Sequence, residues 1–514
     1  MWMLKKIAGL GSCFLFFLYP EYLILDKFKI KIMNSRFINV ITELKGMCVD
    51  FPYPIYAVGG CVRDLILGEE IKDIDIVVEA WEGEKLLTDY LLAKYPEKIG
   101  NLVENIKFHT NRFDLFLSDG SVEQIDCAMT RTETYKKDTR KPDNVGYAGI
   151  SVDSLRRDFT LNALYYDVKT NAILDPTGKG LEDLKNKILR TPLDPAETFE
   201  EDSLRMLRAI RFKHCKNFNL ADEVVSGISM SANSIRTTAR ERITEEFLKI
   251  LGSSSCDSGI IDLHELGLLS YILPELDNYW DMNQKSKYHH LSFSGHTLEV
   301  LKKTAEKSKR LELRMAALLH DIAKPTPSGH QEKSPEHWTY IGHDIESGKL
   351  ASKICSENFK LSKKFTKEVV SLVSNHMIIK PFWNYETKTF TGKDSLVRKV
   401  IRKLGDNLQD TMILVDADNT SHHPDFCMIG QVQQFLDKAK CIKVPDYSTP
   451  IINGNEAAEI LGVKPGPAIN TFLELINHWR DENPDLCKDD IIKNVKEKKG
   501  FNKKFLEEIE ESKK

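Results

Sequence analysis

The 514-residue sequence lacks features that mark several classes of protein. Its ten cysteines are scattered without a Cys-x-x-Cys pair, which argues against zinc fingers and a disulfide framework and favours a reducing compartment. Beyond residues 1–32 no apolar run approaches the roughly 20 residues that cross a membrane, and no internal repeat is visible. Neither charge is in excess, because 72 Lys and Arg stand against 76 Asp and Glu. This balance neither requires nor excludes a nucleic-acid partner, since a local basic face can coexist with an acidic remainder.

The composition predicts several ordered domains. Hydrophobic residues make up 41% and charged residues 29%, which excludes global disorder. At about 150 residues per domain, the length predicts three or four domains. Up to about residue 190 the pattern is mixed α/β, with strands expected at 55–58, 74–78, 112–117 and 122–127 and a helix at 82–94. From about residue 200 amphipathic helices follow, at 200–214, 238–251, 296–308, 311–323, 343–358, 363–376 and 395–418.

Residues 1–32 form a leader of doubtful status. Lys5-Lys6 precedes the apolar run from Ile7 to Leu18, an order similar to the start of a targeting signal. The alternative, which we favour, is that Met33 is the true start, because Asn34-Ser35 and the apolar residues after it predict a capped first helix. We expect a cytoplasmic protein, with organelle targeting by the leader as the alternative.

Gly59 and Gly60 stand at a predicted strand-to-helix junction. Glycines there let backbone N–H groups approach an anion, and the helix that follows adds the positive end of its dipole. Arg63 adds a fork of donors for a phosphate. On its own, the segment is more typical of a tight turn with a surface arginine.

Asp73 and Asp75 are two residues apart at a predicted strand. Alternate residues of a strand share a face, so both carboxylates converge there and repel each other. Mg²⁺ with oxygen ligands would relieve that repulsion, and two such ions can stabilise the attacking and leaving oxygens of an in-line displacement. Asp126, on a later strand, is the candidate third carboxylate, with Glu123 nearby as an alternative.

Five motifs in register resemble class II CCA-adding enzymes and bacterial poly(A) polymerases. They are Val58 to Gly68 with Lys72 to Asp75, Arg156 to Leu164, Asp175 to Leu184, Glu201 to Phe212, and Glu241 to Phe247. One departure is visible, because Phe108-His109-Thr110 stands where relatives commonly carry Phe-Gly-Thr.

The resemblance implies roles for individual residues of this sequence. Those expected to hold the ribose and triphosphate are Arg157, Asp158 and Asn162, and Arg208 and Arg211 are expected to brace their helix or contact phosphate. Asp202 and Arg205, three apart and expected on one helix face, would read the base. A carboxylate beside a guanidinium matches the amino group and ring nitrogen of both cytosine and adenine, whereas uracil and guanine present the opposite pattern.

A second constellation downstream resembles the HD phosphohydrolase domain. By family position its metal ligands would be His296, His320, Asp321 and Asp418, a set that suits a divalent transition metal or magnesium. Such a metal could activate water for phosphoester hydrolysis. Relatives that keep this fold as a scaffold leave the hydrolytic activity an open alternative.

The predicted architecture is an α/β nucleotidyltransferase head with a mixed sheet, followed by an all-α neck, an HD-type body and a tail. The expected boundaries are leader 1–32, head 33–190, neck 191–255, body 256–425 and tRNA-binding tail 426–514. We expect an enzyme that adds CCA, or part of it, to tRNA 3′ ends from CTP and ATP with Mg²⁺ in the head, without a membrane or an evident protein partner. The alternatives are a poly(A) polymerase, an enzyme adding only A or only CC, and a metal-dependent phosphohydrolase whose head binds RNA.

Overall fold

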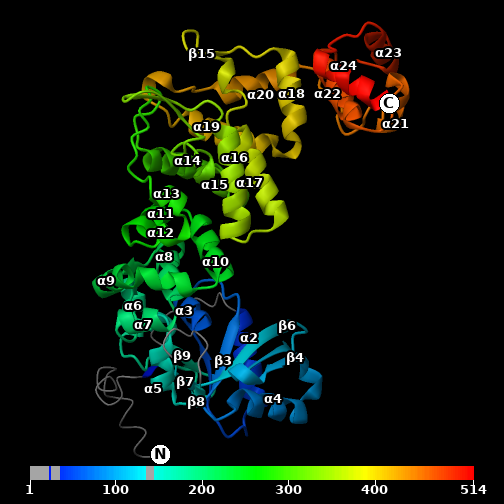
Figure 1. Cartoon of the computed structure of the whole chain (residues 1–514). Coiled ribbons are helices and arrows are strands. Elements are labelled where there is room, and N and C mark those ends of the chain that lie inside the picture. The colour runs from blue at the N-terminus through cyan, green and yellow to red at the C-terminus, as the bar shows by residue number, and fades with distance from the viewer. Residues whose placement is uncertain (1–21, 25–34, 135–143, 514) are drawn as a thin grey trace, which may run out of the picture. The chain divides into compact units, whose positions relative to one another are not determined.

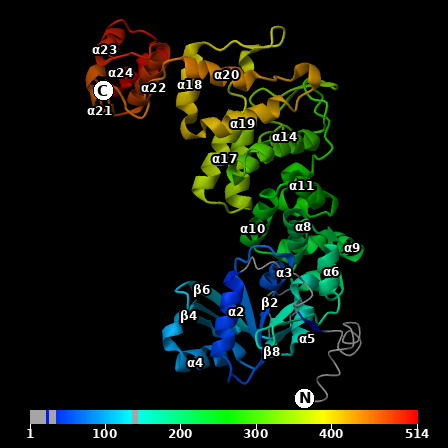
Figure 2. The same cartoon turned by 180° about the vertical axis from the view of Figure 1, so that it is seen from behind.

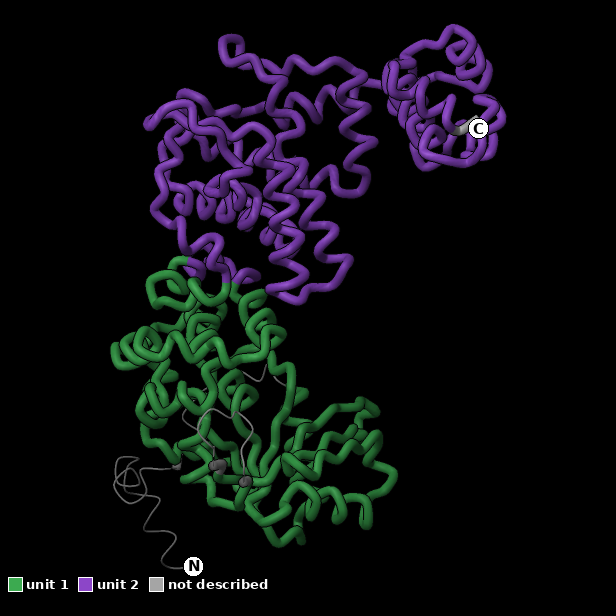
Figure 3. The backbone as a smooth tube through the Cα atoms, viewed as in Figure 1, with its two compact units in different colours: residues 1–250, 261–272 green, residues 251–260, 273–514 purple. Residues whose placement is uncertain are grey.

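The computed structural model describes residues 22–24, 35–134 and 144–513 (Figures 1 and 2). It divides the chain into unit 1 (residues 1–250 and 261–272) and unit 2 (residues 251–260 and 273–514) (Figure 3). The predicted leader lies outside the described residues except for 22–24. Within the described ranges, no helix has the length and apolarity needed to cross a bilayer. The finer division into head, neck, body and tail stays a prediction.

An eight-stranded mixed sheet lies at the centre of unit 1 (Figure 1), in the order β1-β10-β9-β2-β3-β6-β5-β4. The strands are β1 (Tyr22–Ile24), β2 (Ile55–Val58), β3 (Ile74–Val78), β4 (Ile99–Asn105), β5 (Thr110–Phe116), β6 (Val122–Met129), β9 (Tyr165–Asp167) and β10 (Ala172–Leu174). Only the central pair β3 and β6 is parallel, and every other neighbouring pair is antiparallel. The predicted mixed sheet is confirmed.

Two helices, α2 (Ser35–Met47) and α4 (Gly83–Lys94), cover one face of this sheet. Phe37 of α2 meets Tyr166 of β9 edge-on, and the Asn111 side chain of β5 donates to the Glu84 carbonyl of α4. Both strand residues belong to one row across the paired strands, so α2 and α4 share that face. The neighbouring row, which includes Asp75 and Asp126, therefore points to the other face.

The predicted helix at 200–214 is wrong as a single element. Helix α7 (Pro195–Glu201) ends before Asp202, whose backbone is extended, and α8 (Leu204–Lys216) begins two residues later. The Asp202 carboxylate accepts a hydrogen bond from the Leu204 N–H at 3.1 Å. That local bond stabilises the new helix start in place of a continuous helix. Unit 1 continues with α9 (Asp222–Ser231) and α10 (Arg240–Leu251), whose last residue belongs to unit 2.

Unit 2 is mainly helical. Its principal helices are α14 (Phe293–Lys307), α15 (Leu311–Leu319), α16 (His343–Lys353), α17 (Lys363–Asn375), α18 (Asp394–Leu404), α19 (Leu408–Asn419), α20 (Gln431–Cys441), α21 (Gly454–Leu461), α22 (Pro467–Glu482), α23 (Lys488–Lys496) and α24 (Lys503–Lys513). The single helix predicted at 395–418 is wrong, because the chain breaks at Gly405, with φ 49° and ψ −125°. Only glycine enters that backbone region readily. The predicted all-α character of the remainder is confirmed.

A buried carboxylate, Asp153 at the end of α5 (Ile150–Asp153), joins several elements of unit 1. It accepts hydrogen bonds from the Arg131 N–H at 3.0 Å, from Arg156 at 2.9 Å, from Arg157 at 2.8 Å and from the Tyr165 hydroxyl at 2.6 Å. Burial alone would raise the pKa of Asp153, but Arg157 and Arg156 hold it well below its ordinary value.

We predict that Asp153→Asn lowers the free energy of unfolding of unit 1 by about 3 kcal/mol, because it leaves Arg157 buried without its counter-charge. Differential scanning calorimetry at pH 7.5 measures the shift of that transition. The exposed carboxylate variant Asp89→Asn is the matched control and should leave it unchanged. Equal transition temperatures for both variants would contradict a structural role for Asp153.

Candidate functional site

Gly59 separates β2 from α3 (Gly60–Leu67), of which Gly60 is the first residue, and both glycines line a cavity. Gly59 has φ 78° and ψ −133°, a combination that favours glycine. A Cβ at Gly59 would stand 3.7 Å from the Arg157 guanidinium and 4.0 Å from the Asp75 carboxylate. Arg63 is not the surface arginine of the alternative interpretation, since only 6% of it is exposed. It binds Asp64 through two nitrogens, each at 2.8 Å, and donates to the Asn162 side-chain oxygen at 2.7 Å.

The parallel pairing of β3 and β6 brings two of the predicted carboxylates together. Asp75 is directly opposite Asp126 in the register, and Asp73 stands one residue before β3 begins. Glu123, the alternative to Asp126, alternates to the opposite face, where it accepts from Arg36 of α2 at 2.6 Å. The geometry therefore favours Asp126 as the third carboxylate.

The cluster of Asp73, Asp75 and Asp126 carries more negative charge than the neighbouring cationic side chains balance. Burial, followed by the negative charge of Asp126, raises the pKa of Asp75 to about 6, although Arg157 acts in the opposite direction. Asp126 accepts from Arg112 at 2.6 and 3.0 Å. A divalent cation with oxygen ligands would supply the missing charge, so these residues fit the predicted Mg²⁺. In this structure the carboxylate oxygens of Asp73, Asp75 and Asp126 do not all lie within 4.8 Å of one another.

Two of the three residues predicted to hold ribose and triphosphate, Asp158 and Asn162, are hydrogen-bonded to each other, whereas Arg157 is held by Asp153. The Asn162 side-chain nitrogen donates to Asp158 at 2.9 Å, and its oxygen accepts from Arg63. Arg208 of α8 also donates to Asp158 at 2.9 Å. Burial would raise the pKa of Asp158, but Arg208 and Asn162 lower it to about 2, so the residue stays ionised. The orientation of Asn162 is thus fixed by charged partners on both sides.

The predicted base-reading pair does not share a helix face, because Asp202 lies between α7 and α8 whereas Arg205 is in the first turn of α8. Each has a separate partner. Asp202 accepts from Arg242 of α10 at 3.0 Å, and Arg205 donates to Glu201 at 2.9 Å. Spacing alone could not reveal this break, although Arg242 lies within the motif from Glu241 to Phe247.

One cavity of about 600 Å³ collects most of these residues. Nine Lys or Arg side chains and six Asp or Glu side chains line it, so positive charge is in excess where a triphosphate would lie. The predicted site residues among the lining are Gly59, Gly60, Arg63, Asp73, Asp75, Arg157, Asp158, Asn162, Asp202, Arg205, Arg208 and Arg211. Asp126 is not part of that lining. Arg211 donates to Glu246 at 2.9 Å, which fits a bracing role.

The structure shows how His109 is accommodated where relatives commonly carry the glycine of Phe-Gly-Thr. Its backbone has φ 49° and ψ 53°, the left-handed conformation that glycine adopts at least cost. The ring approaches Glu84 at 3.1 Å and packs against Trp81, with centroids 5.5 Å apart. These side-chain contacts offset part of the backbone strain that a non-glycine residue meets there.

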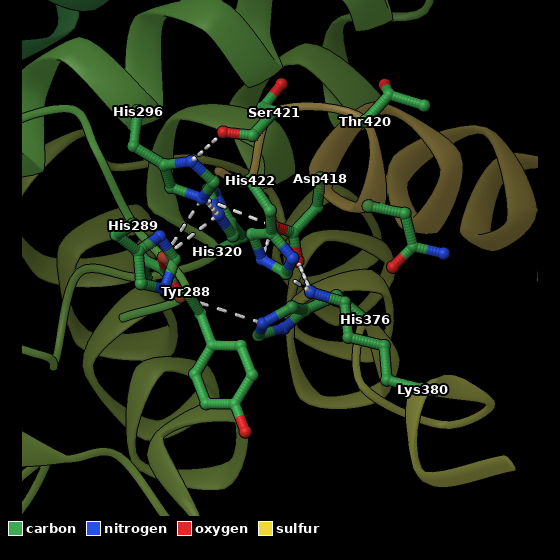
Figure 4. A network of polar contacts seen from close by, with 12 residues as sticks. Tyr288, His289, His296, His320, His376, Lys380, Asp418, Thr420, Ser421 and His422 are labelled. Atoms are coloured by element: carbon green, nitrogen blue, oxygen red, sulfur yellow. Dashed lines mark hydrogen bonds and ion pairs between the residues drawn. The ribbon is translucent and has the colours of Figure 1, made fainter. Parts of the chain in front are cut away.

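Three of the four predicted HD residues, His296, His320 and Asp418, come together in the body, the helical part of unit 2 (Figure 4). His296 of α14 lies 3.2 Å from Asp418 of α19 and 3.5 Å from Asp321, and His320 at the end of α15 lies 3.2 Å from Asp321. All four side chains are almost completely buried. The structure thus brings together the residues that the resemblance assigned to a metal.

Four further histidines surround this group, and the predicted ligand set omitted them. His343 and His376 form a possible metal-ligating triad with Asp321, and His289 and His422 form another with His296. His289 and His422 point toward His296 in Figure 4. His343 and His376 stand in the sequence order that resembles the HD domain, whereas the signal for His289 and His422 is only that histidines concentrate between residues 289 and 423. The convergence of all four depends on tertiary packing.

The body cluster holds most of its imidazoles neutral. Burial lowers the pKa of His296, of His376 and of His422, the last to about 4. His320 is the exception, because burial would lower its pKa but the charge of Asp321 raises it. The neutral imidazole is the metal-ligating form. Burial would raise the pKa of Asp321, but His320 and Lys324 hold it well below its ordinary value, so this carboxylate stays ionised.

A carboxylate pair on a mixed sheet, beside a glycine turn and an arginine-lined cavity, defines a nucleotidyltransferase. Residues 55–190 match the model of the poly(A) polymerase head domain, and residues 293–419 match that of the HD domain. Residues 217–279 match the model described as "Probable RNA and SrmB-binding site of polymerase A".

The chain belongs to the family of CCA-adding tRNA nucleotidyltransferases and poly(A) polymerases. It is 33% identical to the multifunctional CCA protein of Neisseria meningitidis serogroup A over 63% of this chain and 72% of that protein. It is 27% identical to the tRNA nucleotidyltransferase cca1 of Schizosaccharomyces pombe, over 91% of this chain and 96% of that protein. The fold matches the Bacillus stearothermophilus CCA-adding enzyme in complex with CTP, with a TM-score of 0.59 and 21% identity over 90% of this chain and 98% of that one.

Because the pKa of Asp75 is raised, we expect the carboxylate cluster to lower the free energy of unfolding by an amount that depends on pH. In the absence of divalent ions, Asp75→Asn should raise the free energy of unfolding of unit 1 at pH 8 by about 2–3 kcal/mol, because it removes a carboxylate whose ionisation the fold disfavours. Folding raises this pKa, so the gain is full above about pH 6. It shrinks as the pH falls below about 6, where the folded-state carboxyl takes up a proton, and it disappears only below about 3.8, where the carboxyl is protonated in both states.

Calorimetry in EDTA at pH 8 and pH 4.5 tests this difference, with Asp89→Asn as the control. A loss of stability in Asp75→Asn at pH 8 would show that the cluster is electrostatically satisfied without a metal.

Proposed function

We propose that this protein adds CCA to the 3′ ends of tRNA from CTP and ATP without a nucleic-acid template. The observation that carries this proposal is the direct register pairing of Asp75 with Asp126, on a face that meets the Gly59 turn. The motifs for sugar and base recognition line the adjoining cavity. Family membership supports the reaction class.

In this proposal the RNA 3′-hydroxyl attacks the α-phosphate of the nucleotide and pyrophosphate leaves. Asp73, Asp75 and Asp126 would hold Mg²⁺, which stabilises the charge that develops on the reacting oxygens. The Gly59-Gly60 turn lets the backbone approach the triphosphate, and the lining arginines neutralise its charge. Asn162, oriented by Arg63 and Asp158, would bond the ribose hydroxyl that distinguishes RNA precursors from DNA precursors.

We assign base selection to Asp202 and Arg205. The carboxylate accepts from the exocyclic amino group of cytosine or adenine, and the guanidinium donates to the ring nitrogen beside it. Arg242 and Glu201 hold the two side chains when no base is present, so the pair is oriented before the nucleotide binds. The break between α7 and α8 allows Asp202 to leave the helix and face the cavity.

A second candidate activity is metal-dependent phosphoester hydrolysis in the body. The observation that favours it is the buried cluster of ionised Asp321 and several histidines, which suits a transition metal better than magnesium. We also propose a cytoplasmic location, which the unpaired state of the nine described cysteines supports.

Extension of tRNA transcripts that end at the discriminator base, at C and at CC tests the main proposal. Purified protein should extend all three to CCA with CTP and ATP together, and Asp75→Ala should lower the rate at least about 10³-fold, because the metal site is lost. His320→Ala, which alters only the body cluster, should keep this activity. If the protein incorporated only A or only C into these substrates, it would be a partial enzyme and the proposal of complete CCA addition would be wrong.

Assaying the same two variants for release of the nitrophenol leaving group from a nitrophenyl phosphodiester tests the second activity. Here the order is reversed, because His320→Ala should abolish release and Asp75→Ala should retain it. Full release by His320→Ala would show that the body cluster does not catalyse the hydrolysis.

Discrimination against UTP tests the base-reading pair. Asp202→Asn presents an amide N–H to the uracil oxygen, so the ratio of kcat/KM for CTP to that for UTP should fall about 10- to 100-fold, equivalent to about 1–3 kcal/mol. The exposed neighbour variant Glu200→Gln should leave the ratio unchanged. An unaltered ratio in Asp202→Asn would place base selection on other residues.

A further inference from the structure

Arg112 of β5 holds both carboxylate oxygens of Asp126. The two residues are directly opposite each other in the register of β5 and β6. The Nε of Arg112 lies 2.6 Å from one oxygen of Asp126, and its Nη2 lies 3.0 Å from the other. A divalent ion on the same carboxylate would repel this guanidinium, because both are cations at close range. Binding of an ion by Asp126 therefore weakens or breaks the fork.

This ion pair is open to solvent. The exposed fraction is 55% for the side chain of Arg112 and 42% for that of Asp126. Exposed ion pairs contribute little to stability, because water screens the charges and holding long side chains in place costs entropy. An Mg²⁺ ion held also by Asp73 and Asp75 can thus displace the guanidinium. The displaced group stays beside the carboxylates as a cation without a partner of opposite charge.

The row of side chains that contains Arg112 forms the open face of β5 and β6. Residues of this row are partly or fully exposed, whereas the alternate residues of both strands are buried beneath α2 and α4. Only Arg112 in the row is positively charged, so it alone can bind an anion there. The row consists of Thr110, Arg112, Asp114, Phe116, Val122, Gln124, Asp126 and Ala128.

The cavity predicted to hold the nucleotide lies on the other side of the carboxylates. Gly59, Asp73 and Asp75 line it, whereas Asp126 and Arg112 do not. The strand order β2-β3-β6-β5 explains this, because it puts Arg112 beyond Asp126 as seen from the glycine turn. In an in-line displacement the attacking and leaving oxygens lie on opposite sides of the phosphorus. A triphosphate over β2 and β3 therefore leaves the side of β6 and β5 to the attacking RNA 3′ end.

An exposed apolar pair continues this face beyond Arg112. Phe116 and Val122 are opposite each other in the register, with 38% and 51% of their surface exposed. The Phe116 ring packs over Gly100 of β4, where an added Cβ would stand 2.8 Å from it. An aromatic ring open to solvent can stack against a base of single-stranded RNA. An RNA strand that ends at the carboxylates and runs along β5 and β6 would pass both Arg112 and this ring.

We propose that Arg112 exchanges Asp126 for a phosphate of the RNA 3′ end when the head binds Mg²⁺. Without the ion, the guanidinium neutralises Asp126. With the ion on the carboxylates, the same two nitrogens bind a phosphate near the 3′ terminus, a bidentate contact for which guanidinium is well suited. This inference rests on the proposed function, because it concerns the RNA substrate of that reaction.

The salt dependence of RNA binding tests the exchange in the absence of nucleotide. Fluorescence anisotropy measures the Kd of the full-length protein for a tRNA transcript ending in CC, over a series of KCl concentrations. In Mg²⁺, Arg112→Gln should lower the slope of log Kd against log salt by about 0.7, the value for one contact with a single-stranded phosphate. In EDTA it should leave the slope unchanged, because Arg112 is then bound to Asp126.

Two further variants complete the binding test. Arg112→Lys keeps the charge without the fork and should restore most of the slope in Mg²⁺, which also keeps the test available if the glutamine variant misfolds. Lys85→Gln removes an exposed cation of α4, on the opposite side of the sheet, and should leave the slope unchanged. A wild-type slope for Arg112→Gln in Mg²⁺ overturns the RNA contact. An equal fall of its slope in EDTA overturns the exchange.

Steady-state extension identifies which substrate Arg112 contacts. Arg112→Gln should raise the KM for tRNA about 10-fold, through loss of one charge-assisted contact, and leave the KM for CTP unchanged. A raised KM for CTP with an unchanged KM for tRNA would assign Arg112 to the nucleotide and overturn the proposal. If wild-type protein extended no tRNA, the proposed function would fail, and the binding slopes would still decide whether Arg112 contacts RNA.

Discussion

The parallel pairing of β3 and β6 is the constraint on which the chemistry of the head depends. This pairing places Asp75 opposite Asp126, and the strand period of two keeps both on the face that α2 and α4 leave open. Like charges at adjacent register positions are destabilising in a sheet. The fold therefore maintains an electrostatic cost, visible in the raised pKa of Asp75, that a divalent cation would relieve.

The groups around this pair determine what else can bind. The Gly59 turn comes close to both Asp75 and Arg157, so the anion-binding backbone and the metal-binding carboxylates are presented together. Arg157 is in turn fixed by the buried Asp153, which connects α5 to β9. A preorganised charge pattern of this kind stabilises a transition state without reorganisation during the reaction.

Local patterns in the sequence were sufficient to predict an element where polar and apolar side chains follow a short, regular period. The strands at 55–58 and 74–78 have their predicted bounds, because each is a run rich in β-branched and apolar residues that is bounded by turn-forming residues. The helix breaks at Asp202 and Gly405 were missed, because the amphipathic period continues across both sites. Asp202 starts a new helix through a side-chain bond, and Gly405 enters a backbone region that no periodicity reveals.

Tertiary contacts decided the remaining part of the site. His343 and His376 lie on separate helical segments, and only the packing of α16 against α17 brings their rings to Asp321. Arg242 likewise reaches Asp202 from α10 across 40 positions of sequence. Motif resemblance predicted the reacting groups, but it could not identify the partners that orient them, because those contacts depend on distances between elements.

The two candidate metal centres of the chain differ in ligand chemistry. The head offers carboxylate oxygens, which suit a hard ion that retains much of its water, whereas the body offers mainly imidazole nitrogens, which bind transition metals more tightly. A transition metal at the head carboxylates would lack nitrogen ligands, and magnesium in the body would have to exchange water for imidazole. Ligand type therefore favours a different ion at each centre, magnesium at the head carboxylates and a transition metal at the body histidines.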